Sequence, residues 1–146
     1  MTEILLSAGP LRNVLEIGTG SGFQATILAQ LVDRVYSVER IEPLLTKAKE
    51  RFRKLGLRNI TAELSDGSFG WKRHAPYNGI ITTAAPQAIP DDLLHQLAPD
   101  GILVIPVGTG DVQDLRVLRR IGSSSEFEEE IIEQVKFVPL LGGLAQ

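Results

Sequence analysis

The chain of 146 residues contains no cysteine. Disulfide bonds and thiolate chemistry are therefore excluded, and a reducing cytoplasm is the compartment that we expect. No apolar run approaches the roughly 18 residues of a membrane-spanning helix, so the sequence predicts no membrane partner. The opening segment, residues 1–6, has an acidic residue and no basic residue, which is unlike a secretory signal peptide.

The sequence also lacks an excess of positive charge, since its net charge is −3. This balance gives no electrostatic basis for binding nucleic acid. Two histidines that are far apart in sequence, His74 and His95, are too few to predict a metal site. One cluster of basic residues falls mainly on the polar face of a predicted helix, where solvation is the simpler explanation. Its members are Lys47, Lys49, Arg51, Arg53, Lys54 and Arg58.

Short apolar strands alternate with helical segments along the chain, which predicts an α/β fold. We expect a single domain over residues 1–146, with a Rossmann-like, mostly parallel sheet and helices on both faces. No good helix separates the last two strands, so they are predicted to form a C-terminal antiparallel hairpin. The expected strands are 13–17, 34–39, 60–64, 77–83, 101–107, 115–121 and 130–137, and the expected helices are 23–32, 43–55 and 91–97.

The helix that begins near Pro43 gives the clearest periodic signal. Proline is tolerated in a first turn because its missing N–H has no partner there, and Gly56 is a typical C-terminal stop. The apolar stripe expected to face the core contains Leu44, Leu45, Ala48, Phe52 and Leu55.

Three glycines follow the first predicted strand, in the run Gly18-Thr19-Gly20-Ser21-Gly22. A residue without a Cβ lets a ligand approach the backbone closely. Glu39 ends the second strand, and 39 − 18 = 21 residues separate it from the first glycine. This is close to the offset of about 20 residues at which a carboxylate meets the ribose of a nucleoside. Asp66, beside Gly67, follows the third strand, where an acceptor can bind the amine of adenine.

The glycine spacing distinguishes between nucleoside cofactors. In a dinucleotide motif the third glycine comes three places after the second, whereas here Gly22 follows Gly20 by two places and bulky Phe23 comes next. The G-x-G-x-G spacing after Glu16 resembles the first motif of methyltransferases that use S-adenosylmethionine. A nicotinamide-dependent enzyme is the weaker alternative.

Each candidate residue also has a structural interpretation. The glycines alone are compatible with a tight turn, Glu16 with an acid that caps a neighbouring helix, and Asp66 with a common Asp-Gly turn. Three glycines and two acids, each at the C-terminal end of a predicted strand, together favour a cofactor site.

The end of the fourth strand argues against several methyltransferase subclasses. The run Thr82-Thr83-Ala84-Ala85-Pro86 lacks the Asp/Asn-Pro-Pro-aromatic box of enzymes that methylate amino groups of bases. Threonine and alanine side chains are also poor ligands for magnesium. The absence of cysteine excludes covalent attack on a pyrimidine.

Nearly the whole chain resembles the protein-L-isoaspartate O-methyltransferase family, in the right order. Two departures fall at element boundaries, where Tyr77-Asn78 replaces Tyr-Asp and Asp100-Gly101 replaces paired glycines. The segments that carry the resemblance are residues 14–24, 34–40, 65–68, 75–85, 96–108 and 137–140.

A third departure from the family lies at the N-terminus. The family carries a helical region with a Thr-Ile-Ser-type motif, whose serine is regarded as an active-site residue, and nothing in residues 1–11 matches it. We therefore expect a chain that lacks this region, with a cofactor cleft and with impaired or absent transfer activity.

The resemblance implies methyl transfer from S-adenosylmethionine to the α-carboxylate of isoaspartyl residues in damaged proteins, which leads to their repair. It implies that Glu16 and the run Gly18 to Gly22 bind the amino-acid part of the cofactor, Glu39 the ribose, and Asp66 with Gly67 the adenine. No catalytic residue is identified. Thr82, Thr83 and Ala84 are expected where the substrate meets the methyl donor.

Two other functional classes stay open from the sequence. One is a methyltransferase that acts on small molecules. The other is a non-catalytic cofactor-binding or interaction module, in which uncovered apolar surface drives dimerisation. The sequence does not determine the oligomeric state.

Overall fold

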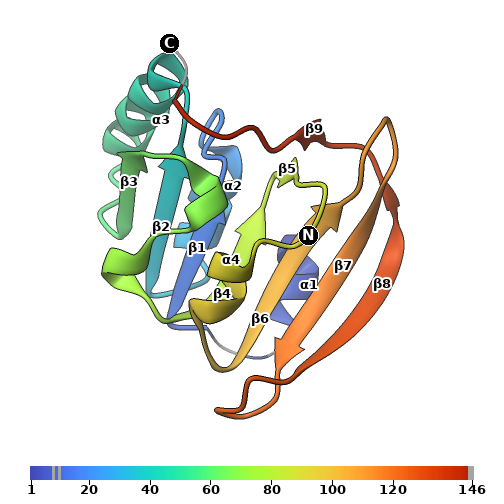
Figure 1. Cartoon of the computed structure of the whole chain (residues 1–146). Helices are drawn as coiled ribbons and strands as arrows, with labels where there is room; N and C mark the ends of the chain where they lie inside the picture. The colour runs from blue at the N-terminus through green and yellow to red at the C-terminus, as the bar shows by residue number, and fades with distance from the viewer. Residues whose placement is uncertain (8, 10, 145–146) are drawn as a thin grey trace.

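The computed structural model describes residues 1–7, 9 and 11–144, and a seven-stranded sheet forms its centre (Figure 1). The strand order is β3-β2-β1-β4-β6-β7-β8. Strands β3, β2, β1, β4 and β6 are parallel, and β7 and β8 continue the sheet as an antiparallel pair. The strand bounds are β1 (Asn13–Ile17), β2 (Arg34–Glu39), β3 (Ile60–Leu64), β4 (Tyr77–Thr82), β6 (Leu97–Val107), β7 (Gln113–Arg120) and β8 (Phe127–Val135).

Helices cover both faces of the sheet, and Figure 1 shows α1 behind it and α4 in front. The helices are α1 (Thr2–Leu6), α2 (Phe23–Ala29), α3 (Glu42–Lys54) and α4 (Asp91–His95), with 3-10 turns η1 (Gly67–Phe69) and η2 (Lys72–His74). A second, two-stranded sheet pairs β5 (Ala84–Ala85) with β9 (Val138–Pro139). Within the described residues, every helix is too short or too polar to cross a membrane.

The alternation of side chains along each strand divides the core into two clusters, one on each face. Leu5 of α1, Leu28 of α2 and Phe52 of α3 pack in one cluster with Val14 of β1. Leu93 of α4 belongs to the other cluster, on the opposite face. The predicted Rossmann-like methyltransferase sheet, with helices on both faces, is confirmed.

Strands β1, β2 and β3 agree best with the sequence, whereas the apolar strand β6 begins at Leu97 rather than at residue 101. The predicted bounds of β1, β2 and β3 are those of the structure. The helix predicted at 23–32 ends at Ala29, and the one predicted at 91–97 ends at His95, where β6 follows almost at once. The hairpin is confirmed, but β7 and β8 both begin and end earlier than expected.

The apolar stripe of α3 is narrower than the sequence predicted. Leu45, Ala48 and Phe52 are buried, whereas Leu44 and Leu55 are 38% and 57% exposed. Leu55 is wrong as a core residue because the helix ends at Lys54 and Leu55 is its cap. Leu44 lies beside a cavity at the edge of the sheet.

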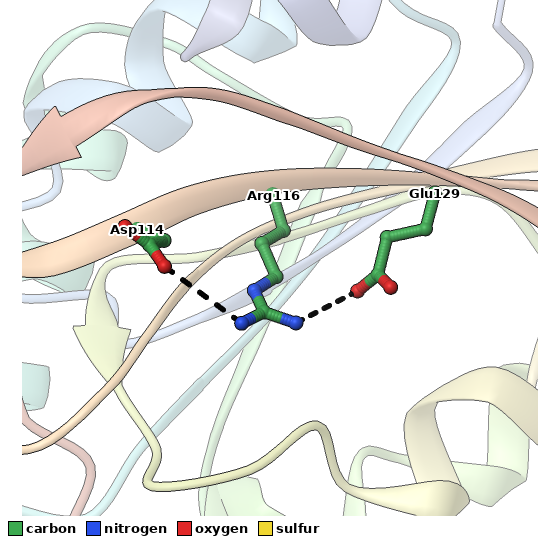
Figure 2. A network of polar contacts seen from close by, with 3 residues as sticks. All are labelled: Asp114, Arg116 and Glu129. Atoms are coloured by element: carbon green, nitrogen blue, oxygen red, sulfur yellow. Dashed lines mark hydrogen bonds and ion pairs between the residues drawn. The ribbon is translucent and has the colours of Figure 1, made fainter.

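The β7–β8 hairpin is held on its surface by pairs of opposite charge. Figure 2 shows Arg116 between two carboxylates, with its guanidinium 3.1 Å from Glu129 and 3.8 Å from Asp114. The stretch of β8 from residue 128 to 134 is exposed on both faces. The outer strand β8 is therefore bonded mainly to β7, whereas β7 places Leu115, Val117 and Leu118 in the core.

Candidate cofactor site

A cavity of about 520 Å³ lies at the C-terminal ends of the parallel strands. Strand order reverses between β1 and β4, so the loops that leave these strands diverge, and open α/β sheets bind ligands at such a point. The lining residues come from the ends of β1, β2, β3 and β4, from the start of α3 and from a C-terminal segment. They are Ile17, Gly18, Gly20, Val38, Glu39, Arg40, Ile41, Leu44, Ser65, Gly67, Thr83, Ala84, Val138, Pro139, Leu140 and Leu141.

The glycine loop between β1 and α2 needs glycine for two reasons. Gly18, Gly20 and Gly22 have φ angles of 97°, 55° and 85°, a region that other L-residues rarely adopt. A Cβ on Gly18 would also lie 2.3 Å from Thr83 Oγ1, and one on Gly22 would lie 2.8 Å from the ring of Phe52. The loop is therefore compact against its neighbours.

Hydrogen bonds from both neighbouring strands fix the loop. Gly18 N and Thr19 N both donate to Val38 O of β2, at 2.9 and 3.2 Å. From the side of β4, Thr83 Oγ1 donates to Gly18 O at 2.9 Å. The loop is thus held in place before any ligand arrives, which lowers the entropy that binding must overcome.

Glu39 stands at the end of β2, 6% exposed, and lines the cavity. Its Oε1 accepts a hydrogen bond from Gly20 N at 2.9 Å, and its Oε2 accepts one from Ile41 N at 3.0 Å. An ionised carboxylate offers about four acceptor positions. Glu39 therefore joins the loop to the start of α3 and keeps acceptor capacity for a ligand.

Asp66 follows β3, and its carboxylate is engaged by the protein itself. Ser68 donates to Oδ1 through its backbone N and its hydroxyl, and Gly143 N donates to Oδ2 at 2.8 Å. Partial burial favours a higher pKa, but these hydrogen bonds and the charge of Arg40 outweigh it and lower the pKa of Asp66. Asp66 is thus ionised at neutral pH and bonded to the C-terminal segment.

The C-terminal segment, Val138–Leu144, closes one side of the cavity. Its strand β9 lies beside β5, and Leu140 N donates to Ala85 O at 2.9 Å. Arg40 Nε donates to Gly143 O at 3.2 Å. The sequence matched residues 137–140 to the family but predicted no strand beyond residue 137, and most side chains of this segment are exposed.

The structure brings half of the predicted site residues to the cavity wall. Those on the wall are Gly18, Gly20, Glu39, Gly67, Thr83 and Ala84. Those behind or beside it are Glu16, Thr19, Ser21, Gly22, Asp66 and Thr82.

Two of the residues behind the wall differ from the expectation for a physical reason. Glu16 is wholly buried beneath the loop, because strand alternation directs its side chain to the face opposite Ile17. Thr82 is also fully buried, and its hydroxyl donates to Ala84 O at 3.2 Å. The side chains of Glu16 and Thr82 therefore do not reach a ligand in the cavity.

The cavity wall is mainly apolar, with a few polar groups, as in a binding site for a small organic molecule. Among the described residues, no cluster of three or more His, Cys, Asp or Glu side chains is arranged to hold a metal ion. A ligand meets aliphatic side chains, glycine backbone and the buried carboxylate of Glu39, and the wall also includes the polar residues Arg40, Ser65 and Thr83.

Comparisons with known proteins agree with this geometry. The family model described as Protein-L-isoaspartate(D-aspartate) O-methyltransferase (PCMT) matches residues 1–145. The chain is 57% identical to the protein-L-isoaspartate O-methyltransferase of Pseudomonas paraeruginosa, covering 98% of this chain and 67% of the relative. It is 55% identical to the enzyme of that name from Cellvibrio japonicus, covering 100% of this chain and 66% of the relative. The chain thus spans about two thirds of the length of these relatives.

Solved structures show the same fold. A protein-L-isoaspartate O-methyltransferase has a TM-score of 0.86 at 23% identity, over 98% of this chain and 46% of that one. The N-methyltransferase NodS from Bradyrhizobium japonicum, in complex with S-adenosyl-L-homocysteine, has a TM-score of 0.62 at 18% identity, over 85% of this chain and 77% of that one. With a family model that covers nearly all of its residues and relatives more than half identical to it, this chain belongs to the protein-L-isoaspartate O-methyltransferase family.

Proposed function

We propose that the cavity binds S-adenosylmethionine and that this chain methylates the α-carboxylate of isoaspartyl residues in damaged proteins. The observation that carries the proposal is the glycine loop joined to Glu39, in a chain that belongs to this family. When bound, S-adenosylmethionine supplies a methyl group activated by its sulfonium centre.

The residues present fit this cofactor. The volume of about 520 Å³ lies within the roughly 300–1,000 Å³ of small-molecule sites. Glu39 keeps lone pairs with which to accept hydrogen bonds from ribose hydroxyls. Ile41, Leu44 and Leu140 offer apolar surface suited to an adenine ring. Gly18 and Gly20 line the cavity, and the space beside Gly20 is open for the amino-acid part.

The carboxylates have different roles in this proposal. Glu39 binds the ribose directly. Asp66 retains one unused acceptor position on Oδ2, next to the bond from Gly143, for the adenine amine. Glu16 supports the loop from behind, which replaces the direct contact expected from the sequence.

Transfer to a carboxylate makes modest demands on the protein. The acceptor is already ionised at neutral pH, because carboxyl groups have pKa values near 4, so no strong general base is needed. Alignment of the two reactants and exclusion of water are the main requirements. Thr83 and Ala84, at the end of β4, border the cavity where the acceptor is expected to approach.

The substrates that we propose are isoaspartyl-containing peptides and proteins, and the proposed compartment is the cytoplasm. The absence of cysteine is compatible with a reducing compartment. The net charge of −3 does not favour nucleic acid as the acceptor.

The test is a transfer assay with two peptides that differ only in one aspartyl linkage. We expect a base-labile methyl ester on the isoaspartyl peptide and none on its normal aspartyl isomer. Equal esterification of both peptides, or faster methylation of small metabolites, would contradict the proposed substrate. Saturable cofactor binding without any ester would instead make the chain a cofactor-binding module. The rate also tests the sequence-based expectation of impaired transfer, since efficient ester formation contradicts it.

A further inference from the structure

Three polar side chains form a hydrogen-bonded row beneath the glycine loop. Thr19 Oγ1 lies 2.6 Å from Ser37 Oγ, and Ser37 Oγ lies 2.6 Å from Glu16 Oε1. Glu16 and Ser37 are completely buried, and Thr19 is 4% exposed. The row connects Thr19, in the middle of the loop, to the interior of the sheet.

The direction of each hydrogen bond follows from the number of protons available. The hydroxyl of Ser37 has one proton and donates it to Glu16 Oε1. The hydroxyl of Thr19 must then donate to Ser37 Oγ. Glu16 is the terminal acceptor, so the whole row is oriented by this carboxyl group.

The second oxygen of Glu16 has no compensating partner. Oε2 is buried and makes no hydrogen bond within the described part of the chain. An ionised carboxylate buried with one bare oxygen is far more costly than a neutral carboxyl group in the same place. Burial raises the pKa of Glu16 to about 8, with a further upward contribution from the charge of Glu39, while the hydrogen bond from Ser37 lowers it. Burial therefore favours the neutral form of Glu16, with its proton on Oε2 so that Oε1 still accepts from Ser37.

Among the residues that the structure describes, no Lys, Arg or His side chain pairs with Glu16. Glu16 lies between Ser37 of β2 and Ile81 of β4, and α2 carries no titratable residue. Tyr36 and Tyr77 belong to the core cluster on the other face of the sheet. The charged side chains of α1 and α3 and that of Arg34 are exposed, namely Glu3, Arg34, Glu42, Lys47, Lys49, Glu50, Arg51, Arg53 and Lys54.

We propose that Glu16 is a positioning residue that acts in its neutral form, holding the glycine loop in its cofactor-binding shape through Ser37 and Thr19. The inference rests on the proposed function, because it takes the loop to be the cofactor site. Thr19 stands between Gly18 and Gly20, the two loop residues on the cavity wall, so a displacement of Thr19 moves both.

Ionisation of Glu16 then opposes cofactor binding. The new charge has no partner on Oε2 and is repelled by Glu39, whose carboxylate is bonded to Gly20 N. The buried charge on Glu16 can be solvated only if the loop opens and lets water reach it. Cofactor affinity should thus fall as pH rises above about 8.

The experiment compares the affinity of S-adenosylhomocysteine for the wild-type chain and for Glu16→Gln, by calorimetry from about pH 6 to about pH 9. Glutamine keeps an oxygen that accepts from Ser37 and cannot ionise. The α-amino group of the ligand titrates in the same range, so the ratio of the two affinities at each pH is the readout. We expect a ratio near one at low pH and a loss of several-fold for the wild type relative to Glu16→Gln at the highest pH. A constant ratio would overturn the proposal.

Ser37→Ala interrupts the row without touching the cavity and serves as the second variant. We expect it to weaken binding several-fold at every pH, because Thr19 loses its acceptor. Affinity equal to that of the wild type would contradict the link between Glu16 and the loop.

The ionisation of Glu16 can be followed without any ligand, by NMR of isotope-labelled glutamate carboxyl groups in the wild-type chain. We expect a midpoint near pH 8 in the free chain and a higher one when S-adenosylhomocysteine is bound. A midpoint near the ordinary value of 4.5 would overturn the proposal. Because this measurement needs only the free chain, a failure of the proposed function, seen as no binding at any pH, is distinguishable from a failure of this inference.

Discussion

The parallel strands β1, β2 and β4 and the antiparallel hairpin β7–β8 belong to one sheet but are stabilised in different ways. Strands β1 and β4 have side chains buried on both faces, as expected where helices cover both sides of a parallel sheet. Most of β8 is exposed, and Glu129 pairs with Arg116 of β7 (Figure 2), as Glu130 does with Arg119. The cavity lies at the ends of the buried strands, on the rigid part of the sheet.

The difference in burial between the two regions indicates where substitutions should affect stability and the cavity. In the parallel part, a side chain affects both the core and the loops that form the cavity. In the exposed strand β8, ion pairs contribute only about 0–1 kcal/mol each, and its side chains at 128–134 make no part of the core. The predictions below test this contrast, and two of them pair a residue of the parallel part with a matched residue outside it.

The largest expected effect concerns core packing. Ile80 of β4 is fully buried, whereas Ile131 of β8 is 56% exposed. Ile80→Ala should lower the free energy of unfolding by about 2–5 kcal/mol, because it leaves a cavity between packed layers. Ile131→Ala should change it by less than about 0.5 kcal/mol. Denaturant unfolding measures both, and equal losses would contradict the contrast between the two regions.

The next effect concerns the glycine loop. Gly18 and Gly110 have similar φ angles, 97° and 82°, but only at Gly18 would a Cβ meet another atom, Thr83 Oγ1 at 2.3 Å. Left-handed backbone strain of about 1–2 kcal/mol is common to both alanine variants. Gly18→Ala should weaken the binding of S-adenosylhomocysteine at least about tenfold, since the loop must also move.

The matched variant Gly110→Ala separates the effect of the glycine loop from that of backbone strain. Gly110→Ala should destabilise the chain slightly and leave ligand affinity unchanged in a calorimetric titration. If both variants bind equally well, the loop does not form the ligand site.

The smallest effect is expected in the ion-pair network of the hairpin. Glu129→Gln removes the partner 3.1 Å from Arg116 but keeps a polar group there. Both side chains are partly exposed, so the loss of stability should not exceed about 1 kcal/mol and should shrink at high salt. Thermal unfolding at low and high salt measures it, and a larger, salt-independent loss would show that the hairpin depends on this network.

Local sequence patterns predicted the parallel part of the fold well. Short β-rich runs predicted the bounds of β1, β2 and β3, and Gly18, Gly20 and Glu39, which the sequence singled out, line the cavity. These features are local, because a strand and its following loop specify their own conformation. The family resemblance added the order of the segments and the cofactor.

The parts that the sequence did not predict depend on contacts between distant residues. Val138–Leu141 line the cavity because β9 pairs with β5, and β5 is a strand of only two residues. Asp66 is turned toward Gly143, which is 77 residues away in the chain. Glu16 precedes the glycine motif directly, yet strand alternation places it behind the loop, which a motif alone does not reveal.

The most direct test of the account is a calorimetric titration of S-adenosylhomocysteine into the wild-type chain, Glu39→Ala and Glu63→Ala. Glu63 is an exposed acid on β3, and its replacement removes the same charge away from the cavity. The account predicts saturable binding to the wild type and to Glu63→Ala, and at least about tenfold weaker binding to Glu39→Ala, which corresponds to 1.4 kcal/mol or more. Equal affinity of Glu39→Ala and the wild type would contradict it.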